Sequence, residues 1–167
     1  MLNAEWNLKL KKMREINKII IHCSATIEGQ DISVDTIRDW HTKDRGWSDI
    51  GYHYYIDING KIFGGRPVAK IGAHSKGYNK SSIGICYCGG LGKDKKAKDT
   101  RTESQKKALV ELIKTLRHIY PSASLHGHNE FANKACPSFD VQKEYKDYQP
   151  KSFKPKSKKA NGKKQSN

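Results

Sequence analysis

The chain has 167 residues, enough for one compact domain that buries a core without disulfide bonds. Its formal net charge of +15 indicates a polyanionic partner, but charge alone does not choose among nucleic acid, anionic lipid and the anionic polymers of bacterial envelopes. The sequence shows neither the ~20-residue apolar run of a membrane-spanning helix nor a signal peptide, so we expect cytoplasmic synthesis, four free thiols and no stable membrane insertion.

The first predicted elements are a polar leader, a buried strand and a helix. Residues 1–16 lack periodicity and predict a flexible leader, within which Met13 is an alternative start of translation. The run 17–24 (NKIIIHCS) is rich in β-branched residues and predicts a central strand. Ser33 is the predicted N-cap of a helix that ends near Gly46. One face of this helix carries Ile37, Trp40 and His41, and we interpret the histidine as a surface or interfacial residue.

A hairpin and a further strand follow. Residues 51–58 (GYHYYIDI) are rich in aromatic and β-branched side chains, which favour a strand. The Asn-Gly pair at 59–60 supplies the positive φ of a tight turn and joins this strand to residues 61–64. Residues 82–88 (SIGICYC) predict the next strand.

The clearest helix comes after a lysine-rich loop. Thr102 and Gln105 form a capping box at its start, and Pro121 stops it. Its apolar stripe consists of Leu109, Leu112, Ile113, Leu116 and Ile119. Residues 122–128 then predict a short strand, and Asp140 caps a last short helix.

Strands separated by helices indicate a single α/β domain at residues 17–148, with a central mixed β-sheet flanked by helices. The following segment, residues 149–167, contains many lysines, no acidic residue and almost no apolar side chains. Such a segment cannot offset its ordering entropy by burial, so we expect a disordered tail. We expect this tail to attract the protein to anionic envelope polymers.

Two histidines and a cysteine have the chemistry of a catalytic zinc site. His22 lies on the first predicted strand, and His128 precedes Cys136 by eight residues. Two imidazoles and a thiolate suit Zn²⁺, whose catalytic sites keep three protein ligands and one open position. Spacing alone leaves open that His22 is a hydrogen-bonded core histidine and Cys136 a small buried residue. His126 competes with His128, because the two would share one face of a strand.

Five short strings carry a resemblance to a known family. They are HCSAT (22–26), GWSDIGYHYYID (46–57), AHSKGYN (73–79), SIGIC (82–86) and KACPSFD (134–140). In this order they resemble the zinc-dependent N-acetylmuramoyl-L-alanine amidases, the family of phage lysozymes of the T-seven type and of the peptidoglycan recognition proteins. The resemblance implies the fold of that family and one Zn²⁺ per chain. The implied ligands are His22, His128 and Cys136.

The resemblance also implies roles for other residues. Tyr52 and Lys134 match catalytic positions, where a phenolic hydroxyl donates a hydrogen bond or shuttles a proton and an ammonium group faces the developing oxyanion. His74 and Lys76 match a loop that lines the substrate groove, and His126 becomes a residue behind the ligands or on the substrate side. The implied reaction is hydrolysis of the amide between N-acetylmuramic acid and L-alanine in peptidoglycan, by a monomeric phage or prophage endolysin.

Two other functions stay open at this stage. One is a peptidoglycan-binding module without catalysis, although the presence of Cys136, Tyr52 and Lys134 favours an enzyme. The other is a regulator that binds nucleic acid or a polymerase, as the T-seven relative inhibits an RNA polymerase. The loop lysines at 93–98 lack the interleaved aromatic residues that stack on bases, which argues against nucleic acid. Without an export signal, the enzyme would act on the wall after release or delivery, as an endolysin or a secreted effector, or would serve in recycling.

Overall fold

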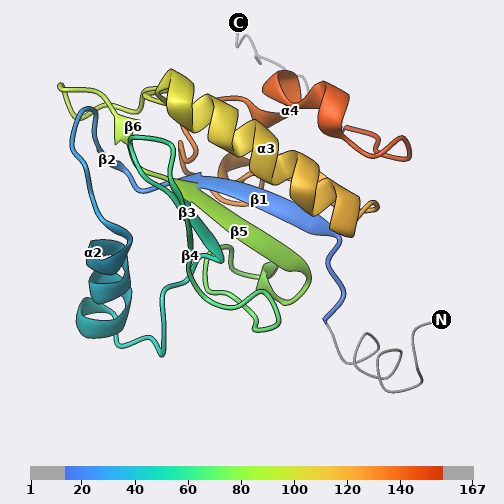
Figure 1. Ribbon diagram of the computed structural model, residues 1–167, viewed down its shortest axis with the longest axis horizontal. Helices are drawn as coiled ribbons and strands as arrows, with labels where there is room; N and C mark the ends of the chain where they lie inside the picture. Colours follow the sequence, from blue (N-terminus) through green and yellow to red (C-terminus); the bar gives the residue numbers. More distant parts are fainter. Residues whose placement is uncertain (1–13, 156–167) are drawn as a thin grey trace, which may run out of the picture.

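The computed structural model describes residues 14–155, and five strands form its central sheet (Figure 1). These strands are β1 (Lys18–Cys23), β3 (Tyr54–Ile56), β4 (Ile62–Gly64), β5 (Ser82–Tyr87) and β7 (Ser124–Gly127). Their order is β4-β3-β5-β1-β7, and only the β3–β4 pair is antiparallel. A separate parallel pair is formed by β2 (Thr26–Ile27) and β6 (Gly90–Leu91). The predicted α/β domain with a mixed sheet is confirmed.

The long helix α3 (Glu103–Ile119) covers one face of this sheet (Figure 1). The predicted capping box is present, since the Gln105 amide donates to Thr102 Oγ1 at 3.1 Å and the Thr102 amide donates to Gln105 Oε1 at 3.0 Å. The apolar side chains that α3 buries are Ala108, Leu109, Leu112, Ile113 and Leu116. Ile119, which we predicted on the same apolar face of the helix, is instead 58% exposed, because it is the last residue of α3.

The opposite face of the sheet carries a second, smaller core. The remaining helical segments are α2 (Val34–Asp39), which continues into a π-helical turn (Trp40–Asp44), α4 (Val141–Glu144), and 3₁₀ turns at Asn79–Ser81, His128–Glu130 and Lys146–Tyr148. Ile37 of α2 packs with Tyr55 and Cys86 on the face opposite α3. Trp40, predicted on the buried face of this helix, is 37% exposed. Within residues 14–155, no helix combines the length and the apolar character needed to cross a membrane.

Alternation along β1 assigns its side chains to the two cores. Ile21 and Cys23 belong to the core beneath α3. His22 lies between them and pairs in parallel register with Cys86, which belongs to the opposite core. His22 therefore lies on the face of the sheet away from α3, opposite Cys23, as the period of two predicts.

The predicted hairpin is present but shorter than expected. Its strands begin at Tyr54 instead of residue 51, because the Gly51 amide donates to His41 Nδ1 and the Gly51 carbonyl accepts from the Ala73 amide. These bonds pull the chain before β3 toward neighbouring loops. Gly60 has the positive φ that the turn requires, at 82°.

The ordered domain extends beyond both predicted boundaries. Ile16 is buried in the core beneath α3, so the predicted leader at 1–16 is wrong for its last residues, while Met13 lies outside the described part. At the other end, the Gln149 side chain pairs with the backbone of Leu125, accepting from its amide and donating to its carbonyl, each at 2.8 Å. Gln149, the first residue of the predicted tail, therefore belongs to the domain, because its side-chain amide pairs with backbone hydrogen-bonding groups of the edge strand β7.

The Arg14 guanidinium ties the N-terminal segment to the loop before β5. Its Nε donates to the Val68 carbonyl at 2.7 Å, and its Nη1 donates to the Ser82 carbonyl at 2.8 Å. Arg14→Ala removes these donors and leaves the carbonyls to water, so we expect the free energy of unfolding to fall by roughly 1–3 kcal/mol. Urea denaturation measures the change, with exposed Glu15→Ala as the matched control. Equal stability of the Arg14→Ala and Glu15→Ala proteins would show that the hydrogen bonds of Arg14 do not stabilise the fold.

Candidate metal centre and substrate groove

Folding brings three distant side chains together at one end of the sheet. His22, His128 and Cys136 each offer one ligand atom, and these atoms all lie within 4.8 Å of one another. His22 Nδ1 is 3.8 Å from Cys136 Sγ, and the centroids of the His22 and His128 rings are 4.5 Å apart. His22 is buried, whereas His128 and Cys136 are half-buried, so the cluster has an inner and an outer side.

The elements that carry these residues explain their meeting. His22 is near the end of β1, and His128 opens the 3₁₀ turn that directly follows β7, the parallel neighbour of β1. Cys136 is hydrogen-bonded both to β1 and to the 3₁₀ turn that follows β7. The Cys136 carbonyl accepts a hydrogen bond from the Asn129 amide at 2.8 Å, and Cys136 Sγ accepts one from the Cys23 amide at 3.3 Å.

The protonation of the cluster suits a metal ion. Burial, followed by the charges of neighbouring groups, lowers the pKa of His22 well below its usual range, and burial likewise lowers the pKa of His128. Both rings therefore keep a free lone pair at neutral pH. The neighbouring Cys23 thiol and burial raise the pKa of the Cys136 thiol, which a coordinated dication deprotonates. Two nitrogens and one sulfur form a donor set that fits Zn²⁺ and not the oxygen-preferring Mg²⁺ or Ca²⁺.

His74 lies behind His22 and not only beside the groove. His74 Nδ1 is 2.9 Å from His22 Nε2, and His74 Nε2 is 3.2 Å from Ser82 Oγ. The ring is only 8% exposed, and burial lowers the pKa of His74 to about 3. The resemblance implies substrate binding for His74, whereas its hydrogen bonds link it to a candidate ligand.

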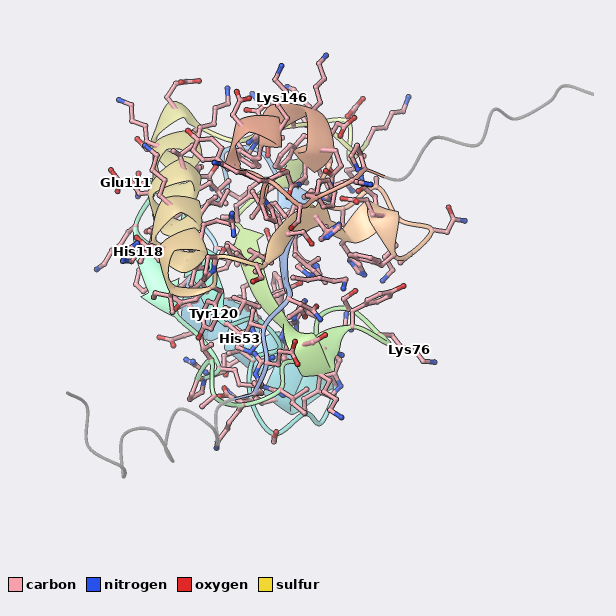
Figure 2. All side chains as sticks on the ribbon, turned by 90° about the vertical axis from the view of Figure 1, so that its right-hand side faces the viewer. His53, Lys76, Glu111, His118, Tyr120 and Lys146 are labelled. Carbon is pink, nitrogen blue, oxygen red and sulfur yellow. The ribbon has the colours of Figure 1, made fainter. Side chains whose placement is uncertain are left out.

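A cavity of about 470 Å³ opens beside His128. Its cationic side chains are Arg45, Lys76 and Lys134, and its apolar walls include Trp47 and Phe131. None of the residues that line it is acidic. Lys76 extends from its loop at the edge of the molecule (Figure 2). The structure thus brings Lys76 and Lys134 to one groove next to the three candidate ligands.

Tyr52 packs against the candidate ligands, with its ring centroid 5.2 Å from that of His22. Burial raises the pKa of the Tyr52 hydroxyl well above its usual range. Like any tyrosine hydroxyl at neutral pH, this group is protonated and can donate a hydrogen bond. His41 supports it from behind, with ring centroids 5.4 Å apart, while His41 Nδ1 accepts from the Gly51 amide at 2.9 Å. The interpretation of His41 as a surface or interfacial residue is therefore wrong. Its one clue in the sequence was its place on the apolar face of the predicted helix.

The structure does not bring His126 to the cluster. His126 Nδ1 is 2.9 Å from Glu130 Oε1, and His126 Nε2 is 2.7 Å from Ser124 Oγ. Its ring lies between those of Phe131 and Phe153, at centroid distances of 5.1 and 5.7 Å. The chain leaves the strand after Gly127 and turns, which separates His126 from its neighbour at 128.

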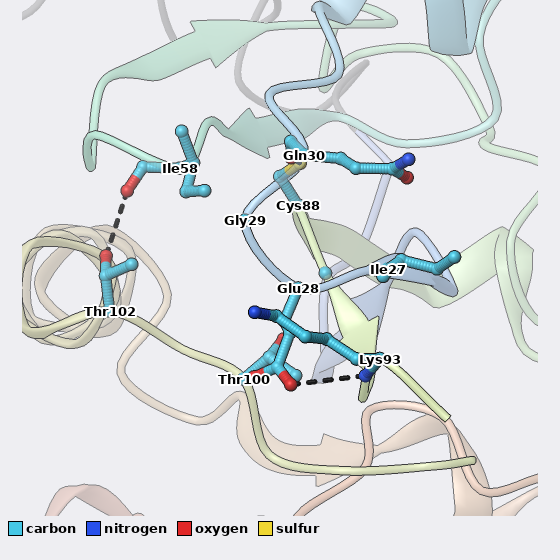
Figure 3. A pocket seen from close by; sticks show the side chains of 10 residues that line it. Ile27, Glu28, Gly29, Gln30, Ile58, Cys88, Lys93, Thr100 and Thr102 are labelled. Carbon is cyan, nitrogen blue, oxygen red and sulfur yellow. Dashed lines mark hydrogen bonds between the residues drawn. The ribbon is translucent and has the colours of Figure 1, made fainter. Parts of the chain in front are cut away.

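A second hollow, of about 310 Å³, lies between the loop at 27–30, Ile58 and the loop that precedes α3 (Figure 3). Its polar groups bond within the chain. Glu28 Oε1 accepts from the Lys93 amide at 3.2 Å, and Thr102 Oγ1 donates to the Ile58 carbonyl at 2.9 Å. None of the candidate ligands or catalytic residues lines this hollow, so the groove beside His128 is the better site for chemistry.

Comparison with known proteins finds extensive similarity. A family model described as N-acetylmuramoyl-L-alanine amidase matches residues 12–139. The endolysin of Escherichia phage T7 is 41% identical over 136 residues, covering 81% of this chain and 89% of that protein. Among solved structures, the Ph2119 endolysin of a Thermus scotoductus bacteriophage has a TM-score of 0.68 at 28% identity, covering 86% of this chain and 94% of that one. The N-acetylmuramoyl-L-alanine amidase LysC from Clostridium intestinale has a TM-score of 0.67 at 29% identity, covering 80% and 83%.

The buried histidines predict a loss of stability in mild acid. Burial lowers the pKa values of His41 and His53 from 6.5 to about 4, so in the folded protein both rings stay neutral where the unfolded chain takes up protons. The free energy of unfolding is therefore highest above pH 6.5 and falls as the pH drops toward 4, by on the order of 3 kcal/mol per residue. Urea denaturation of metal-free protein from pH 8 to about pH 4 measures this slope.

Removal of one titrating ring identifies its share of that slope. His53→Gln is expected to flatten the pH dependence of stability, whereas His118→Gln, at an exposed position on α3 (Figure 2), is expected to leave it unchanged. An identical slope in both variants would show that His53 is not responsible.

Proposed function

This chain belongs to the N-acetylmuramoyl-L-alanine amidase family, and on that premise we propose that it works with one Zn²⁺ held by His22, His128 and Cys136. The protein is a peptidoglycan-cleaving enzyme of the endolysin type, which confirms the family resemblance and disfavours a purely binding or regulatory role. The convergence of the three ligand atoms within 4.8 Å is the observation that supports the metal. A bound Zn²⁺ supplies a water molecule that is nucleophilic near neutral pH and polarises the amide carbonyl.

Tyr52 and Lys134 act on the charge that develops at the amide. The Tyr52 hydroxyl is protonated at neutral pH, as tyrosines ordinarily are, and donates a hydrogen bond to the carbonyl oxygen as it becomes negative, worth roughly 3 kcal/mol. Lys134 lies at the exposed rim of the groove, and its charge contributes to the lowered pKa values of both His22 and His128. The same proximity allows its ammonium group to stabilise the oxyanion.

The groove favours an acidic substrate. Arg45, Lys76 and Lys134 line it without an opposing carboxylate, and Trp47 and Phe131 provide apolar contacts. Peptidoglycan stem peptides combine free carboxylates with short aliphatic side chains. We therefore place the stem peptide in this groove, with Lys76 as one of its binding residues. The protein is expected to act as a monomer.

Substitution of individual residues separates metal binding from catalysis. His22→Ala and Cys136→Ala are expected to lose zinc and activity together, because each removes a ligand. Lys134→Ala is expected to keep zinc while its turnover falls by about 10²–10³-fold. Metal analysis combined with release of stem peptides from purified peptidoglycan gives both readouts. Lys146→Ala, an exposed lysine on the turn after α4, is the matched control. Full zinc content in Cys136→Ala would contradict the ligand set.

The lysine-rich C-terminal segment is proposed to concentrate the enzyme on anionic wall or outer-membrane polymers. Deletion of residues 156–167 removes five lysines and spares Gln149 and its contacts. We expect slower lysis of intact walls at low salt and an unchanged rate on soluble fragments, because surface attraction is screened by salt. Turbidity clearing at several salt concentrations tests this, and equal clearing by both proteins at every concentration would refute it.

A further inference from the structure

The contact between His22 and His74 involves a residue that belongs neither to the candidate ligands nor to the groups facing the amide. We propose that His74 is a positioning residue for the proposed metal centre: its Nδ1 accepts a hydrogen bond from the Nε2–H of His22 and thereby holds the tautomer of His22 that offers Nδ1 to the ion. This inference depends on the proposed metal site and adds a specific residue to it.

The geometry assigns every ring proton along this chain of contacts. His22 Nδ1 faces Cys136 Sγ at 3.8 Å, so Nδ1 is the nitrogen on the ligand side and must carry the lone pair. The proton of the neutral His22 ring then lies on Nε2, which is 2.9 Å from His74 Nδ1. His74 Nδ1 must be the acceptor, which leaves the His74 proton on Nε2, 3.2 Å from Ser82 Oγ.

The protein holds His74 rigidly enough for such a role. Ser82 anchors its Nε2, and the His74 backbone amide donates to Asn79 Oδ1 at 2.9 Å. Gly84 provides the space for the ring, because a Cβ at that position would lie 2.6 Å from His74 Cγ. Gly72 also approaches the ring closely, since a Cβ at that position would lie 2.8 Å from His74 Cδ2. The loop residue is therefore locked against β5 directly behind the ligand.

The chemistry of this partner differs from the usual arrangement. Metal-bound histidines commonly use the ring N–H that faces away from the ion to donate a hydrogen bond to a carboxylate, a carbonyl or a water, and a carboxylate raises the basicity of the ligand. Within residues 14–155 no aspartate or glutamate is buried, and His22 has a neutral imidazole in the carboxylate position. A neutral acceptor orients the ligand without adding negative charge, which preserves the positive charge of the ion for catalysis.

Two variants of His74 test the proposal on zinc affinity. His74→Leu removes the acceptor and is expected to weaken zinc binding by about 10–100-fold. His74→Asn places an amide oxygen close to the position of Nδ1, so its affinity is expected to stay within about threefold of the parent protein. Competition with a chelator measures both, and the melting temperatures of the metal-free proteins separate a loss of ligand orientation from a loss of folding.

Nitrogen NMR of the zinc-loaded parent protein provides a readout that needs no substitution. The expected spectrum shows His22 and His74 both protonated at Nε2. Protonation of His74 at Nδ1, parent-like zinc affinity of His74→Leu, or equal losses in both variants would overturn the proposal. If His74→Leu does not fold, the asparagine variant and the spectrum decide. If the parent protein itself binds no zinc, the proposed metal site fails, which is a different result from failure of the role of His74.

Discussion

Parallel pairing of β1 with β7 is the constraint on which the metal centre depends. The register places Ile21 opposite Gly127, so the next residues along the two chains, His22 and His128, emerge side by side. A slip of one residue would send the His22 ring into the core beneath α3, because side chains alternate between the faces of a sheet. Ile19, Ile20 and Ile21 directly precede His22 on β1 and are fully buried, so the strand that carries this histidine is also part of the hydrophobic interior. The same strand therefore contributes both to the hydrophobic interior and to the cluster of candidate ligands.

The loop that carries Cys136 needs support of its own, which comes from a buried charge. Arg101 is the only lysine, arginine, aspartate or glutamate buried within residues 14–155. Its guanidinium pairs with Asp99 at 2.8 Å, donates to the Tyr145 hydroxyl at 2.9 Å and lies 3.4 Å from the centre of the Phe139 ring. These contacts join the loop before α3 to the segment just after Cys136. A buried charge is tolerated here because it is paired, hydrogen-bonded and stacked.

Neutral histidines and charged side chains occupy different parts of the candidate site. His22 and His74 are buried and His128 is half-buried, and burial lowers the pKa of all three rings, whereas the cations that line the groove, Arg45, Lys76 and Lys134, are exposed. Burial suppresses protonation where lone pairs are needed, and exposure preserves charge where an acidic substrate arrives. The large positive charge of the chain thus coexists with a cluster of neutral donors that suits the proposed dication.

Short sequence patterns were sufficient to predict much of the fold of this protein. The capping box at Thr102, the run of β-branched residues around His22 and the short strings of the amidase family predicted the helix, the central strand and the fold, because each depends on neighbours in the sequence. Tertiary structure alone decided that Ile16 joins the core, that His41 is buried next to Tyr52, and that His74 contacts His22 while His126 lies apart. Those outcomes depend on contacts between residues far apart in the chain, and no local pattern encodes which side chain will meet which across a folded sheet.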